Sequence, residues 1–505
     1  MRLLTLILAF GLFFRLLSIY PNNVILGFDQ ARDLFASWRI VAENDLRIVG
    51  PTAGNNAALH HGVAFLYLII PPIFLGGGNP FWVSLWLSVL NLASVFVLYL
   101  FAKSLFKSER AGLIAALLTS VSYYFVQFAG WISNPSPTLL TVPLVFYGLW
   151  KYKQGQALYM PISLFFLGLS IQFELFFLYL IPVFVILWFV LKLKAPKLKV
   201  ISYSLLAISL SLSTMILTEF KFRFSGALSL LSDLVRKTGS KPPFFLTLKE
   251  FLNRYFETFS LNLLPSVPSA GRLLGVLLLS YLVFRMLSEK NLKLRLGLKL
   301  LVVYLLSPFA MLVLGFHAAP WVLIGLSPAI IIATSYVLSK IRIPFFLYLL
   351  LFIFLTSNIL NLRSSIGHAQ PLLGPDESSI VSTQIAAINY TYQKAGGKPF
   401  AVNTVTNPLY VNAVWAWDYK WYGERKYGYL PGWLGGDQEK PFDVLREHGE
   451  SKDGATFFLI TDTTPRIPEI HKTLALNWAE EHGSLIEEKS FGTISVSAWK
   501  AIKPF

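Results

Sequence analysis

The sequence contains no cysteine among its 505 residues, and only 14% of its residues are charged. Without thiols the chain cannot form disulfides, bind a metal through thiolates or use a cysteine nucleophile. Soluble domains are about 25% charged and roughly 45–50% apolar, whereas 55% of this chain is hydrophobic. The composition therefore excludes an ordinary water-soluble enzyme and indicates a chain with many membrane spans.

Hydrophobic runs that could cross a bilayer, which takes about 20 residues, recur through the first 361 residues. They lie near 2–20, 80–102, 111–131, 137–151, 157–174, 175–191, 200–218, 270–287, 298–316, 320–338 and 344–361. We interpret 2–20 as an uncleaved first transmembrane helix, because Arg15 interrupts it and no small-residue cleavage site follows. The run 62–76 is short and contains Pro71-Pro72, which predicts a half-inserted or interfacial helix. The expected fold is an α-helical integral membrane protein with about eleven transmembrane helices.

The formal charge of +16 is concentrated in alternate loops. Lysine and arginine cluster at 103–110, 151–153, 192–199, 285–299 and 340–342. The positive-inside rule makes these loops cytoplasmic, which accounts for much of the charge and argues against a nucleic-acid partner. The loops 21–79 and 218–269 and all residues after 361 then lie on the extracytoplasmic side of a cell (inner or plasma) membrane.

Residues 362–505 differ in character from the rest. Strand-like runs occur at KPFAVNTV, TFFLITDT and GTISVSAW, with helical stretches near 378–395 and 467–481. This alternation predicts a small extracytoplasmic α/β domain, and hence two domains, 1–361 and 362–505. The Trp- and Tyr-rich stretch 415–436 fits sugar-stacking rings, an interfacial belt or an aromatic core.

Charged residues crowd into GFDQARDLFASWRI, residues 27–40, directly after the first hydrophobic run. On a helix, Asp29, Arg32 and Asp33 would share one face. A carboxylate there could accept a proton in a reaction outside the cytoplasm. It could equally belong to a local ion pair that contributes roughly 0.5 kcal/mol.

This stretch resembles the GT-C superfamily of polytopic membrane glycosyltransferases. Within it, the nearest pattern is that of the bacterial enzymes related to protein O-mannosyltransferases and aminoarabinose transferases. Those families place an Asp-Glu pair early in the first outside loop, often followed by a basic residue. Here the pair is Asp29-Gln30, followed by Arg32. Asp29 matches the aspartate that is catalytic in those families, whereas Gln30 replaces their second acid.

Further stretches carry the same resemblance across residues 1–360. GPTAGNNAALHHGVAFLYLIIPPIFLGGGNPF resembles the family's juxtamembrane helices and keeps His61-Gly62. ERAGLIAALLTSVSYYFVQFAGWISNPSPTLL resembles the third span and its turn, with Asn134 where relatives have an acid or Asn. LGFHAAPWVLIGLSPAIIIA, which contains His317, resembles a late span.

The resemblance implies transfer of a sugar from a polyprenyl phosphate to an acceptor on the extracytoplasmic face, with Asp29 as general base. The chemistry agrees, because an acceptor hydroxyl must lose its proton and a positioned carboxylate can take it. Attack from the face opposite the leaving group would invert the anomeric centre. A lipid phosphate leaves without a general acid, and nearby cations lower the barrier. The polar residues proposed to contact substrate or phosphate are Arg32, Asp33, His61, Asn134, Arg236, Lys237, Lys241 and His317.

Several alternatives stay open. His60 and His61 could hold a divalent metal with Asp29, but adjacent histidines diverge and no third ligand has suitable spacing, so we expect no metal site. Glu174, in an apolar run, is either functional or a helix-end acid that reaches water. A transporter or flippase of lipid-linked sugars is the main competing function, although the inverted repeats typical of transporters are not evident. A non-catalytic scaffold is a third interpretation. The sugar stays open, as does the choice among lipid, glycan and protein acceptors.

Overall fold

The computed structural model describes residues 2–54, 56–235, 244–314, 321–366, 377–435 and 455–502. The chain divides into two compact units, each assembled from segments distant in the sequence. The first unit comprises Met1–Ser18, Leu46–Leu68 and Trp86–Ser364. The second comprises Ile19–Asp45, Ile69–Leu85 and Ser365–Phe505. The sequence-based division at residue 361 stays a prediction, and each unit is described separately below.

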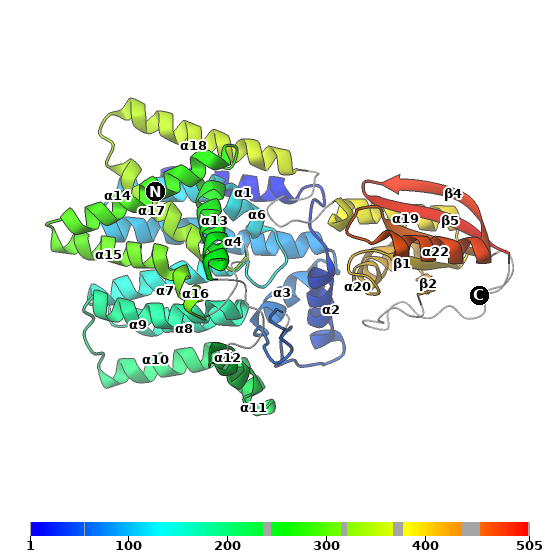
Figure 1. Cartoon of the computed structure of the whole chain (residues 1–505), viewed down its shortest axis with the longest axis horizontal. Helices are drawn as coiled ribbons and strands as arrows, with labels where there is room; N and C mark the ends of the chain where they lie inside the picture. Colours follow the sequence, from blue (N-terminus) through cyan, green and yellow to red (C-terminus); the bar gives the residue numbers. More distant parts are fainter. Residues whose placement is uncertain are drawn as a thin grey trace. The chain divides into compact units, whose positions relative to one another are not determined.

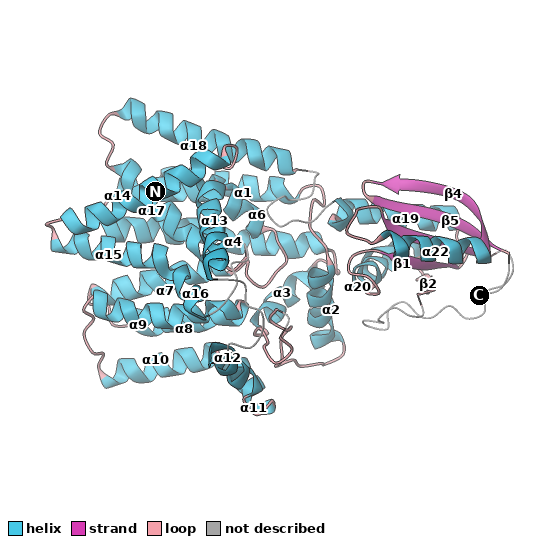
Figure 2. Cartoon of the chain, viewed as in Figure 1, coloured by secondary structure: helices cyan, strands magenta, loops and turns pink. Residues whose placement is uncertain are grey.

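The first unit is built almost wholly of helices (Figures 1 and 2). They are α1 (Arg2–Ile19), α4 (Pro80–Phe106), α5 (Glu109–Val121), α6 (Tyr123–Ala129), α7 (Thr138–Lys153), α8 (Tyr159–Phe173), α9 (Leu180–Val190), α10 (Leu198–Ser211), α11 (Ser213–Lys221), α12 (Ser225–Val235), α13 (Phe244–Leu263), α14 (Pro268–Ser288), α15 (Leu292–Leu306), α16 (Ala310–Leu314), α17 (Ser327–Ser339) and α18 (Pro344–Ser365). Short 3-10 turns lie at Leu175–Tyr179, Ser307–Phe309 and Ile324–Leu326.

Five helical segments of the described chain are long and apolar enough to cross a membrane, and up to seven if each bent pair counts as one span. The bent pairs are α5 with α6, at 58°, and α10 with α11, at 63°. Shorter apolar helices lie at Tyr159–Phe173, Leu175–Val190 and Ile324–Ser339. The count of about eleven spans stays a prediction. Helix α3 (Ala64–Leu75) has 12 residues and contains Pro71 and Pro72, in keeping with the short helix expected at 62–76.

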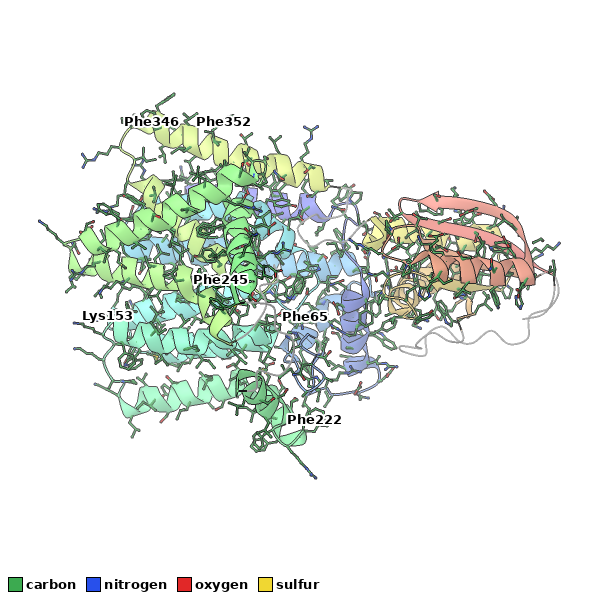
Figure 3. The ribbon with its side chains drawn as sticks, viewed as in Figure 1. Phe65, Lys153, Phe222, Phe245, Phe346 and Phe352 are labelled. Atoms are coloured by element: carbon green, nitrogen blue, oxygen red, sulfur yellow. The ribbon has the colours of Figure 1, made fainter. Side chains whose placement is uncertain are left out.

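The surface of the first unit carries large apolar side chains. On α18, Phe346 and Phe352 point outward, and their residues are 52% and 67% exposed (Figure 3). Phe245, at the start of α13, is 80% exposed. Apolar patches of this kind are rare on monomeric soluble proteins, and a lipid environment explains them.

Arg15 shows how a cation is accommodated inside an apolar helix. Its guanidinium is fully buried and donates from Nε and Nη2 to the Asn91 side-chain oxygen, at 3.0 and 2.8 Å. It also donates to the backbone carbonyls of Gly11 and Ser120, at 2.9 and 3.3 Å. These bonds satisfy a buried cation that would otherwise be costly, and they join α1 to α4 and α5.

The second unit contains a five-stranded sheet, shown in magenta in Figure 2, with the strand order β2-β1-β3-β5-β4. The strands are β1 (Phe400–Val405), β2 (Gly432–Trp433), β3 (Thr456–Asp462), β4 (Gly483–Phe491) and β5 (Ile494–Ala501). Strands β2, β1 and β3 are parallel, whereas β3 with β5 and β4 with β5 are antiparallel. Its helices are α2 (Phe28–Ala42), α19 (Val381–Ala395), α20 (Ala413–Asp418), a π-helix (Tyr419–Gly423), α21 (Glu424–Tyr427) and α22 (Glu469–His482), with a 3-10 turn at Glu377–Ser379.

Two helices cover opposite faces of this sheet. Neighbouring residues of a strand point to opposite faces. Phe457 of β3 packs with Ala479 of α22, whereas Phe458 packs edge-on to Tyr390 of α19. All three predicted strand runs and both predicted helices of 362–505 are present. Strands β2 and β4 are not among the predicted runs, and β4 carries three consecutive charged residues within LIEEKS, a pattern that is not typical of a strand.

Candidate functional site

The charged stretch of residues 27–40 lies on helix α2 (Phe28–Ala42), with Gly27 as its N-cap. Helix α2 begins after Gly27, whose N–H donates to the Gln30 side-chain oxygen at 3.0 Å. Asp29 lies in the first turn, where the helix dipole favours a negative charge. Asp29 therefore lies in the N-terminal turn of α2, two residues after the N-cap Gly27.

Arg32 bridges the two carboxylates of this helix. Its Nη1 lies 2.7 Å from Asp29 Oδ1, and its Nε and Nη2 each lie 2.9 Å from Asp33 Oδ1. The two acids differ in their surroundings, because the Asp29 side chain is 64% exposed and that of Asp33 only 4%. The shared helix face is confirmed, and Asp29 is the more exposed of the two acids.

Burial sets the protonation behaviour of Asp33. Loss of solvation raises the pKa of its carboxyl to about 6, although the Arg32 guanidinium acts in the opposite direction. An acid that changes charge near neutral pH, next to a cation and a second acid, is typical of functional sites.

The predicted residue His61 lies in the first unit, beside Glu174. His61 Nδ1 is 3.5 Å from Glu174 Oε1 and accepts the Leu175 N–H at 3.3 Å. The next residue, Gly62, donates its N–H to the Gln172 carbonyl at 2.9 Å. A Cβ atom at position 62 would lie 2.8 Å from that same carbonyl oxygen, so the His-Gly pair needs its glycine for this close approach.

A small cavity of about 50 Å³ adjoins these histidines. Its lining is formed by Leu59, His60, His61, Leu175, Met215, Thr218, Glu219 and Leu230. His60 is held by a 3.0 Å hydrogen bond between Nδ1 and the Gly50 carbonyl and stacks on Phe222. The cavity has room for a few water molecules or one small polar group. Within the described part of the chain, no three His, Asp or Glu side chains are placed to share a metal ion.

The remaining predicted residues have different outcomes. Asn134 is 7% exposed, in the turn between α6 and α7 of the first unit, and its side-chain oxygen is buried without a hydrogen-bond partner among the described residues. A buried acceptor of that kind can receive a bond from a substrate hydroxyl. Arg236, Lys237, Lys241 and His317 lie outside the described residues, so their proposed roles stay predictions.

The aromatic stretch beginning at Trp415 mostly forms core. Trp415, Trp417, Tyr419 and Trp433 are each at most 2% exposed, which supports the aromatic-core interpretation for these rings. Sequence analysis missed the buried acid between them, Asp418. Its carboxylate accepts the Trp421 Nε1–H at 2.9 Å, and burial raises its pKa to about 8. The only signal in the sequence is an acid flanked by aromatic residues, which also describes many surface acids.

Comparison with known proteins gives matches to the structure but none to the sequence. The sequence matches no protein-family model, and no curated protein matches it significantly. The structure matches ArnT from Cupriavidus metallidurans bound to undecaprenyl phosphate, with a TM-score of 0.61 and 10% identity, over 98% of this chain and 97% of that one. Apo ArnT from the same organism gives 0.58 and 11%, with the same coverage of both chains. The oligosaccharyltransferase of Archaeoglobus fulgidus in its apo form gives 0.50 and 12%, over 85% of this chain and 64% of that one.

The chain has a GT-C fold. The resemblance drawn from the sequence is therefore confirmed at the level of the fold, although identities of 10–12% say nothing of shared chemistry. The GT-C fold and the apolar helices together identify a multi-pass membrane protein.

Proposed function

We propose that this protein is a membrane glycosyltransferase that moves a sugar from a polyprenyl phosphate to an acceptor on the extracytoplasmic face. The observation that carries the proposal is the solvent-exposed Asp29 carboxylate at the start of α2, bound to Arg32, in a chain with a GT-C fold. One solved protein with this fold, ArnT, was crystallised with undecaprenyl phosphate, which supports a lipid-linked donor here.

The reaction requires one base and one leaving group. Asp29 accepts the proton of an acceptor hydroxyl as its oxygen bonds to the anomeric carbon. The bond from that carbon to the phosphate oxygen breaks on the opposite face, so the sugar is transferred with inversion and the lipid phosphate departs. Arg32 keeps Asp29 oriented through the 2.7 Å contact between its Nη1 and Asp29 Oδ1.

Contacts to the donor come from polar residues that sequence analysis singled out. His61, Asn134 and His317 are proposed to contact sugar or phosphate. The cations Arg236, Lys237 and Lys241 are proposed to bind the phosphate and stabilise the charge that develops on it. Asp33, buried and partly neutral near pH 6, tunes Arg32 and does not act as the base.

The test is sugar transfer by the purified protein in lipid nanodiscs. We expect activity with a polyprenyl-phosphate sugar and none with the matching nucleotide sugar, because the proposed site lies outside the cytoplasm, where nucleotide sugars are made. Replacing Arg236, Lys237 and Lys241 together by Gln should weaken use of the donor more than use of the acceptor. Efficient transfer from a nucleotide sugar without lipid carrier would contradict the proposal. Movement of the lipid-linked sugar across the bilayer without transfer would favour the flippase alternative.

A further inference from the structure

A chain segment that leads into the acidic helix is paired with the C-terminal part of the sequence. Residues 22–26 run antiparallel to residues 379–382, both within the second unit. The backbone contacts are Leu26 N–H to the Ser379 carbonyl (2.7 Å), Val381 N–H to the Val24 carbonyl (3.0 Å), Ser382 N–H to the Asn22 carbonyl (3.3 Å) and a bridge between Ile25 and Ile380. The entry to α2 is thus held by residues more than 350 positions away in the sequence.

One side chain reinforces this pairing. Gln384 of α19 is 1% exposed, and its Nε2 donates to the Leu26 carbonyl at 3.0 Å and to the Ser378 carbonyl at 2.9 Å. Leu26 directly precedes Gly27, the residue that caps α2. Gln384 therefore holds the carbonyl of the residue that precedes the N-cap of the helix that carries Asp29.

A second contact holds the same helix further along. The Phe35 ring of α2 packs edge-on against the Trp417 ring of α20, with 4.8 Å between centroids. The Trp417 Nε1–H in turn donates to the Gly78 carbonyl at 3.1 Å. The start of α2 and a position about two turns along it are therefore both held by other residues of the second unit.

The ion pair that Asp29 makes cannot fix the position of α2 relative to the rest of the second unit. Its carboxylate is bound by Arg32, which lies on the same helix and moves with it. The position of the carboxylate relative to a substrate is therefore determined by how α2 is held, and a misplacement of 1 Å can cost about 100-fold in rate.

We propose that residues 377–435 and 455–502 act as a positioning element for α2, with Gln384 as the positioning residue that sets the place of Asp29. This inference rests on the proposed function, in which Asp29 is the base. It gives the C-terminal domain a role in turnover that is separate from binding the donor.

The test compares two buried substitutions on α19 in the full chain, in nanodiscs. Gln384→Met keeps a side chain of similar size and removes both donated bonds. Thr391→Val is the matched control, because Thr391 is fully buried on the same helix and bonds Tyr419 and the Ile388 carbonyl, away from residues 22–26. The readouts are kcat, KM for the polyprenyl-phosphate sugar, and hydrogen–deuterium exchange of residues 22–36.

We expect Gln384→Met to lower kcat by about 10- to 100-fold, the range that small misplacement produces, with KM for the donor changed by no more than about 2-fold. Exchange at residues 22–36 should rise by about 10-fold or more, since the Leu26 carbonyl loses the bond from Gln384 that supports the pairing of residues 22–26 with residues 379–382. Thr391→Val should leave kcat and this exchange as in the wild type, even if it lowers thermal stability to the same degree.

Three results would overturn the inference: an unchanged kcat in Gln384→Met, unchanged exchange at residues 22–36, or an equal loss of kcat in Thr391→Val. Failure of the proposed function has a different signature, namely no transfer by the wild-type protein. In that case the exchange comparison still decides whether Gln384 holds α2.

Discussion

Replacing Asp33 by asparagine should make α2 more resistant to local unfolding at neutral pH and leave it unchanged at pH 4. Burial raises the pKa of Asp33 from 3.8 to about 6. A raised acid pKa means that the folded state holds its proton more tightly than the unfolded state does. The stabilising contribution of the protonated acid is therefore complete below about pH 4 and is lost as the pH rises to about 6.

The size of the effect follows from the shift. A shift of about two pKa units, at 1.36 kcal/mol per unit, corresponds to about 3 kcal/mol between pH 4 and pH 7. Asparagine has the shape of the protonated acid but cannot ionise, so Asp33→Asn should not show this loss. In local opening equilibria, 3 kcal/mol is roughly a hundredfold.

Hydrogen–deuterium exchange of the α2 amides, corrected for the intrinsic effect of pH, measures this difference directly. The comparison of variant with wild type at each pH cancels contributions from other acids such as Asp418. Asp29→Asn is the control, because the exposed Asp29 side chain should change the opening free energy by less than about 1 kcal/mol. If Asp33→Asn instead loosens α2 more at pH 7 than at pH 4, the Arg32 ion pair outweighs desolvation and the reasoning is wrong.

Two further predictions concern catalysis and topology. Asp29→Asn should reduce turnover by about 100-fold or more, since it removes the proton acceptor while donor binding is kept. Asp33→Asn is the control and should reduce turnover much less. Normal turnover in Asp29→Asn would end the case for Asp29 as the base. Reporter fusions at Lys194 and Lys420 should report opposite sides of the membrane, with Lys194 cytoplasmic, because lysine and arginine cluster in alternate loops; matching signals from the two sites would show that the number of spans between them has the wrong parity.

Local patterns in the sequence predict several elements of the fold correctly. The spacing of Asp29, Arg32 and Asp33 predicts their shared helix face, since residues three and four apart are neighbours on any helix. The three strand runs of 362–505 are β-branched and aromatic, and they form strands. These features depend on residues close together in the chain, so they can be predicted without tertiary structure.

Features that depend on distant contacts could not be predicted. Residues 111–131 were expected as one continuous span, but the helix breaks at Ser122. The Asn358 side-chain oxygen of α18 accepts the Tyr123 N–H at 2.7 Å, and the Ser122 hydroxyl accepts the Phe125 N–H. A partner more than 200 residues away gives the backbone an alternative to the helical bond, and no local pattern shows it.

The contrast between Asp29 and Asp33 has the same origin. Both are acids on one face of one helix, and no local sequence pattern predicts which of the two is buried. In the folded chain the Asp33 side chain is buried, whereas that of Asp29, one turn earlier, stays exposed. The difference in exposure therefore comes from tertiary packing, which the local sequence pattern does not show.

The geometry of α2 gives a physical role to Gln30, which stands where the resembled families have a glutamate. Where the families that the sequence resembles have a second acid, this chain has Gln30, whose side-chain oxygen accepts the Gly27 N–H at the first turn of α2. The second carboxylate near Arg32 is supplied by Asp33 instead, one turn further along the helix and out of solvent. Because a buried second acid loses its charge as the pH falls towards 6, Arg32 is then left paired with Asp29 alone. Of the two acids that contact Arg32, Asp29 is the exposed one, and the proposed mechanism, which needs one base and a good leaving group, is compatible with a glutamine at position 30.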